Sequence, residues 1–115
     1  MRASEFIIEA AEYKTIPKVF PDGDLKLTTH FDRDRRVERN IDMERVLDMC
    51  HRAAVQWPDK LRDINPGSSF VIADWDNFRV AIVKRERLGN GFDYILTTAR
   101  DDLRTGPDQV VIRLR

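Results

Sequence analysis

One charged segment of this 115-residue sequence brings together the side chains that phosphodiester chemistry uses. His30 is followed by Arg33, so a helix would carry both on one face. An imidazole can move a proton at a 2′-hydroxyl or a leaving oxygen, and a guanidinium can hold two phosphate oxygens. Further arginines follow in the same segment, at Arg35, Arg36 and Arg39. The segment therefore offers a candidate His/Arg site for cutting a phosphodiester.

The same segment also supports a purely structural interpretation. Asp32, Asp34 and Glu38 alternate with the arginines and could pair with them on a solvent-exposed helix. His30 would then be only a residue at the start of that helix. The residues alone leave both interpretations open.

A second group of candidates lies in the C-terminal half. Thr97 or Thr98, on a predicted central strand, could supply a hydroxyl to a phosphate, and Arg79 or Arg113 could contribute positive charge from neighbouring strands. Threonine also favours strands and an arginine stem covers apolar surface, so both types suit a half-exposed sheet without a ligand. Trp75, in a turn, is a candidate for base stacking or for an interface.

Metal, thiol and phosphate-loop chemistry find no support. Cys50 falls in an apolar helical stripe, which favours a buried, inert thiol, and His51 lies just beside that stripe. One cysteine and two histidines match no zinc motif, and no glycine-rich phosphate loop is present. We therefore predict no metal site and no cofactor.

These side chains need a scaffold, and the apolar pattern predicts helices in the first half of the chain. Ser4 opens a short amphipathic pattern, and an irregular arm through residue 24 follows it because prolines and Gly23 disfavour regular structure. A second helix is expected from His30. The clearest helix begins after Asp42, carries apolar residues every three or four positions, and ends before Pro58.

Alternation and turn signals predict strands after Gly67. They indicate four antiparallel strands, with Gly89-Asn90-Gly91 as a hairpin turn: 69–73, 78–83, 92–98 and 110–114. We therefore expect an α+β fold in which two to three N-terminal helices pack on a four-stranded antiparallel meander formed by the C-terminal half. Residues 1–24 would be a helix and arm, and residues 25–115 a single domain.

Charge and composition restrict the partners and the cellular location that we expect. The net charge is zero, which does not indicate a polyanion partner, but the bases outnumber the acids by eight to five from Phe78 onward. That excess predicts either a basic face on the sheet or a mixed, solvated surface. A single cysteine, an N-terminus unlike a secretory signal and the lack of a membrane-length apolar run predict a reducing, cytoplasmic location without membrane insertion.

Three stretches of the sequence together resemble a known group. They are Leu27-Thr28-Thr29-His30-Phe31 leading into Arg33, Arg39-Asn40-Ile41-Asp42 opening a helix, and Thr97-Thr98 within a strand-rich half. Across about residues 25–100 the chain is similar to the barnase/EndoU/colicin/RelE-like superfamily, in particular its small bacteriophage members. The opening Met1-Arg2-Ala3-Ser4-Glu5-Phe6-Ile7 also resembles the starts of phage virion and accessory proteins.

The resemblance implies a metal-independent RNase, located in the host cytoplasm or in the virion if the chain is encoded by a phage. His30 would be the acid/base, and Arg33, less directly Arg36 or Arg39, would hold the phosphate. Thr97 or Thr98 would be the hydroxyl on the sheet. The chain departs from the commoner pattern at Asp34, where that pattern has its first arginine. Phage members can also be structural, so the alternative is a non-enzymatic protein that binds a phage or host protein through its N-terminal arm and sheet edge.

Overall fold

The helix expected after Asp42 is present in the computed structural model, which describes residues 14–28, 41–76, 78–87, 91–101 and 104–115. Helix α3 spans Met43–Gln56, and the Asp42 side chain caps it by accepting a hydrogen bond from the Glu44 amide at 3.0 Å. Pro58 opens the short helix α4, Pro58–Asp63. The prediction of this helix and its cap is confirmed.

Three of the expected strands are also present, as an antiparallel meander. They are β3 (Ser69–Ala73), β4 (Phe78–Glu86) and β5 (Phe92–Asp101), and each pairs antiparallel with the next. A fourth strand, β6 (Val110–Arg113), pairs with β3. It runs parallel to β3, because the chain after β5 returns along the sheet before β6 begins.

The prediction that N-terminal helices pack on a four-stranded antiparallel sheet is wrong. The sheet has six strands in the order β1-β2-β5-β4-β3-β6 and is mixed, because β2 also runs parallel to β5. The added strands form a hairpin of β1 (Lys14–Phe20) and β2 (Gly23–Leu27). The two described helices lie between β2 and β3 in the chain rather than at its start. Periodicity identifies a strand but not its partner or its direction, so it could not show that β6 runs parallel to β3 or that β2 pairs with β5.

The expected irregular arm is instead an edge strand. Proline lacks an N–H for the ladder, but an edge strand needs only one side paired, so Pro17 fits in β1. The register shifts between Ile16 and Phe20, and Lys18 adopts a φ of 59° within that irregularity. The expected domain boundary at residue 24 falls inside β2. The helices expected from Ser4 and His30 lie outside the described residues, as do two of the three residues of the expected 89–91 turn.

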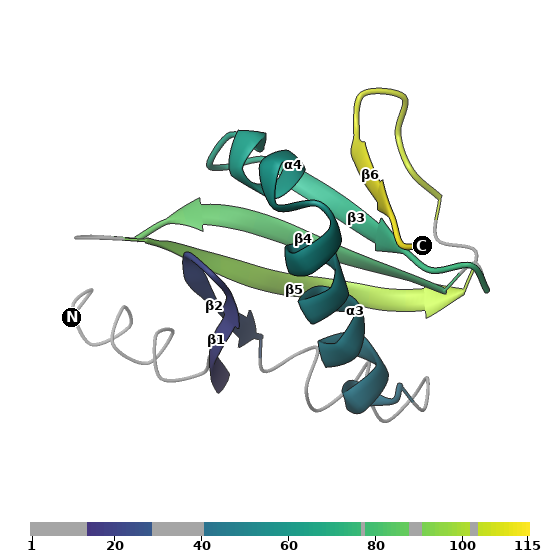
Figure 1. Ribbon diagram of the computed structural model, residues 1–115, viewed down its shortest axis with the longest axis horizontal. Coiled ribbons are helices and arrows are strands. Elements are labelled where there is room, and N and C mark those ends of the chain that lie inside the picture. Colours follow the sequence, from purple (N-terminus) through teal and green to yellow (C-terminus); the bar gives the residue numbers. More distant parts are fainter. Residues whose placement is uncertain (1–13, 29–40, 77, 88–90, 102–103) are drawn as a thin grey trace, which may run out of the picture.

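Both described helices lie on one face of the sheet, as Figure 1 shows. The core forms between α3 and this face, and its fully buried strand residues include Phe70, Ile72, Val80, Ile82, Tyr94 and Leu96. Lys84 is buried on this face as well, and its Nζ donates to the carbonyl oxygens of Leu61 (2.8 Å) and Arg62 (3.3 Å). That contact fixes α4 to the sheet. No helix in the described part of the chain is both long and apolar enough to cross a membrane.

Candidate functional site

Three arginines form a row across the face of the sheet opposite α3. Arg79 on β4 pairs directly with Arg100 on β5, and Ala73 on β3 pairs with Arg79 on one side and Arg113 on the other. Residues that pair directly across strands point to the same face, and this face is opposite to Phe78 and Val80 of the core. We call Arg79, Arg100 and Arg113 the arginine row.

The arginine row concentrates positive charge at one end of the sheet. Arg100 and Arg113 are exposed and Arg79 is half-buried. Arg79 and Arg100 face each other directly across β4 and β5, and like charges in that arrangement repel each other. Within the described part of the chain, no ion pair joins Arg100 or Arg113 to an acid.

A β-bulge at Thr97 determines which side chains join this face. Ala81 pairs with Thr98, whereas the next residue of β4, Ile82, pairs with Leu96, so Thr97 is an extra residue in β5. Without it, Thr98 would point into the core on the same side as Leu96. The bulge therefore turns Thr98 and Arg100 toward the face that carries Arg79. The Thr97 hydroxyl donates to the Ala81 carbonyl oxygen at 3.1 Å and so stabilises the bulge.

The two threonines consequently have different roles. Thr97 makes a hydrogen bond within the sheet, whereas Thr98 lies in the row next to the arginines, diagonal to Arg79. Diagonal neighbours on one face lie about 7–8 Å apart, within reach of a long side chain. Of the two predicted hydroxyls, Thr98 is the one that shares a face with Arg79 and Arg113.

The opposite end of this face is electrically mixed. Asp93 is 5% exposed and lies near three cations, with oxygen–nitrogen distances of 3.8 Å to Lys26, 3.6 Å to Arg85 and 3.2 Å to Arg87. Arg87 also lies 3.5 Å from Asp24. On this face, Asp24 and Asp93 lie at one end with their cations and the arginine row lies at the other, whereas Asp74, Asp76 and Asp101 are close to the end that carries the row.

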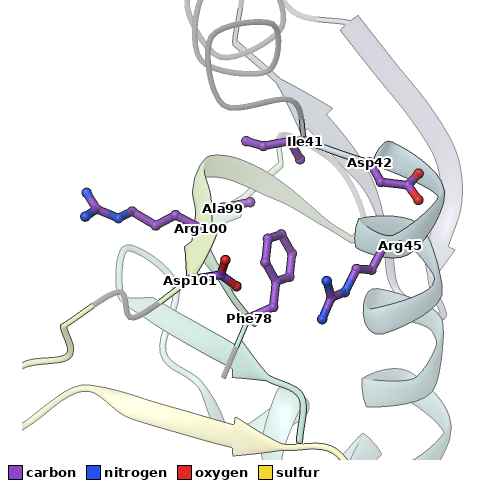
Figure 2. Close-up of a pocket in the computed structure, with 7 residues that line it drawn as sticks. All are labelled: Ile41, Asp42, Arg45, Phe78, Ala99, Arg100 and Asp101. Carbon is purple, nitrogen blue, oxygen red and sulfur yellow. The ribbon is translucent and has the colours of Figure 1, made fainter. Parts of the chain in front are cut away.

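A hollow of about 480 Å³ lies around the same end of the sheet, on the α3 side. Figure 2 shows Phe78 at its centre, with Arg45 of α3 on one side and Asp101 on the other, while the Arg100 side chain extends away from Phe78. The Arg45 guanidinium donates to Asp74 at 2.6 Å and lies 4.4 Å from the centre of the Phe78 ring. The hydrogen bond to Asp74 raises the pKa of Arg45. Its charge is therefore already used to join α3 to the turn between β3 and β4.

The strand that carries Arg113, β6, is held by hydrogen bonds to the end of α3. Trp57, at the end of α3, donates from Nε1 to the Arg113 carbonyl oxygen at 2.9 Å, and the Arg115 amide donates to Gln56 at 2.8 Å. These bonds involve the backbone of β6 and its following residues, so the Arg113 side chain remains on the face of the sheet opposite α3. An edge strand of four residues is thereby held in a defined position.

Several predicted site residues lie outside the described part of the chain. They are His30, Arg33, Arg36 and Arg39. Of the described candidates, Thr98, Arg79 and Arg113 share one face, whereas Thr97 has the bulge role above. Sequence reasoning missed Arg100, although its position two residues after Thr98 in a strand was a signal that both side chains point the same way.

The described residues contain no group of three histidine, cysteine or acidic side chains that could hold a metal ion. Cys50 is fully buried in α3, and burial raises the pKa of its thiol to about 12. His51 is exposed on the same helix.

Comparison with protein-family models, with curated proteins and with solved structures finds no match for this chain.

Proposed function

We propose that this protein is a metal-independent endoribonuclease-like domain that binds RNA on the face of its sheet opposite α3. The observation that carries the proposal is the arginine row, in which Arg79 and Arg100 face each other directly and Arg113 lies two strands away. Phosphate contacts from arginines provide most of the affinity of proteins for nucleic acid. A guanidinium can also bind two phosphate oxygens at once, which fixes the position of the backbone.

The residues on either side of the segment around His30 lie close to β5. Leu27 pairs with Leu96 just before the described residues end at Thr28, and Ile41 lines the same hollow as Ala99 where they resume. The described residues just before and just after that segment therefore both lie next to the last part of β5. The same part of β5 carries Thr98 and Arg100.

The proposed chemistry divides the work between these residues. His30 removes the proton from the 2′-hydroxyl, whose oxygen attacks the neighbouring phosphorus, and the bond to the 5′-oxygen of the next nucleotide breaks. That oxygen takes a proton from water, and the hydroxide left behind takes the proton held by His30. Arg33 and the arginine row stabilise the charge on the phosphate oxygens, and Thr98 donates a hydrogen bond to one of them. The products are a 2′,3′-cyclic phosphate and a free 5′-hydroxyl. The proposal includes a bacteriophage origin and action in the host cytoplasm.

Incubation of the pure protein with single-stranded RNA in the presence of EDTA tests the proposal. The expected result is cleavage by the wild type, with cyclic phosphate ends, and loss of cleavage in His30→Ala. A matched control is His51→Ala, since His51 is exposed on α3, on the other side of the sheet. If the wild type and His30→Ala leave the RNA equally intact, the enzymatic proposal is wrong.

The second candidate is a non-enzymatic protein that binds a phage or host protein through its arm and sheet edge. It is favoured by the open sheet, whose edge strands are β1 and β6, and by Val110, which is 41% exposed on β6. Removing residues 1–24 would delete all of β1, so a truncation there would disturb the sheet as well as the N-terminal arm. Val110→Lys is the better test, because a partner that adds a strand at β6 would be lost in co-purification while the fold is kept.

A further inference from the structure

Trp75 is the most exposed aromatic side chain in the described part of the chain, with 81% of its surface open to solvent. It lies in the turn between β3 and β4, two residues after Ala73. Neither the core nor the proposed cleavage chemistry uses it. A large apolar ring in such a position indicates a contact with another molecule.

The turn that carries Trp75 is held firmly from both sides. One oxygen of Asp74 accepts hydrogen bonds from the amides of Asp76 (2.9 Å) and Phe78 (3.1 Å), and the Asp74 amide donates to the Phe78 carbonyl oxygen at 3.1 Å. The other Asp74 oxygen binds Arg45 of α3. The tryptophan is therefore presented on a fixed backbone, which lowers the entropy lost when a ligand binds.

Trp75 lies between two acids, Asp74 and Asp76, and the Asp76 side chain is 53% exposed. Arg45 lies 2.6 Å from Asp74 and 3.4 Å from Asp76, so one guanidinium offsets part of the charge of both carboxylates. The Asp74 side chain is only 12% exposed. Most of its charge is directed into the turn and toward α3 rather than toward solvent.

The turn also adjoins the arginine row. Ala73 pairs directly with both Arg79 and Arg113. Two residues of chain span at most about 7 Å, so the Cα atom of Trp75 lies within that distance of the Cα atom of Ala73. Proteins that bind single strands combine a positive track for the backbone with aromatic side chains on which bases stack. The arginine row supplies the first of these parts, and Trp75, in the turn that follows Ala73, supplies an exposed ring.

We propose that Trp75 stacks on an unpaired base of RNA whose phosphates lie on the arginine row, so that the site takes single-stranded rather than double-stranded RNA. This inference rests on the proposed function and names its class of substrate. In a duplex the bases are stacked on one another and present no free face to a side chain. An exposed tryptophan at the end of a basic row therefore favours strands with splayed bases.

The test measures binding of a fluorescein-labelled oligouridine dodecamer with 2′-O-methyl groups, which lacks the attacking hydroxyl and cannot be cleaved by the proposed route. The same oligonucleotide annealed to its complement is the double-stranded probe. Trp75→Ala should weaken binding of the single strand by roughly 5- to 150-fold. Trp75→Phe should restore most of the affinity, because a ring remains. Val55→Ala, which removes another exposed apolar side chain, should have no effect.

Tryptophan fluorescence gives an independent readout, because the chain has two tryptophans and Trp57 packs against the core. The single strand should quench the emission of the wild type and leave that of Trp75→Phe unchanged. If Trp75→Ala binds the single strand as the wild type does while Arg100→Gln binds it more weakly, the stacking inference is wrong and the proposed function stands. If Trp75→Ala weakens both probes equally, the preference for single strands is wrong. Failure of the wild type to bind either probe overturns both proposals.

Discussion

The arginine row predicts how RNA binding should respond to salt when one arginine is removed. If Arg79, Arg100 and Arg113 each neutralise one phosphate of a single strand, the logarithm of the binding constant should fall with the logarithm of salt concentration at a slope of about −2.1. Between about 50 and about 200 mM salt, that slope weakens binding about 18-fold. Arg100→Gln leaves two contacts, so the slope should become about −1.4 and the loss about 7-fold.

The assay is fluorescence anisotropy of the uncleavable single strand at four salt concentrations. Arg52→Gln is the matched control, because Arg52 is also an exposed arginine but lies on α3 and pairs with Asp48 at 3.0 Å. The control should keep the slope of the wild type. The reasoning is refuted if Arg100→Gln keeps the wild-type slope, or if Arg52→Gln lowers it by the same amount, since RNA would then respond to net charge rather than to this row.

Two further predictions concern the scaffold. Thr97→Val should lower the free energy of unfolding by about 1 kcal/mol in urea titrations, because the Ala81 carbonyl loses its hydrogen bond, and Thr97→Ser should restore it; equal stability of the three proteins would contradict the role given to the bulge. Burial raises the pKa of the Cys50 thiol from 9.0 to about 12, so the folded protein holds a proton that the unfolded chain releases. The resulting contribution is complete below about pH 9 and is lost as the pH rises toward about 12. The stability difference between the wild type and Cys50→Ala, measured under reducing conditions, should therefore fall by about 1 kcal/mol between about pH 8 and about pH 10, and a constant difference would contradict it.

The sequence predicted local structure well where a single physical signal decides it. The cap at Asp42 and the apolar spacing after it identify α3, and alternation identifies β3, β4 and β5. Strand partners depend instead on contacts between distant parts of the chain. The parallel pairings of β2 with β5 and of β6 with β3 leave no mark in the local pattern, so the topology could not be obtained from it.

The candidate site was predictable only in part, for a related reason. Arg79, Arg113 and a threonine were identified by type, but their meeting on one face depends on the bulge at Thr97. Strict alternation through β5 would place Thr98 with Leu96 in the core. The break in the pattern is visible afterwards, because the core residues Leu96 and Ala99 are three positions apart instead of two.

The location of the RNA is the central claim, and it can be measured directly by NMR chemical-shift mapping of the labelled protein with the uncleavable single strand. We expect the largest changes in the backbone amides of Arg79, Thr98, Arg100 and Arg113, with the α3 residues Asp48 and Arg52 unchanged. Changes centred on α3, or no changes as the RNA is added, would contradict the proposal that the face opposite α3 binds RNA.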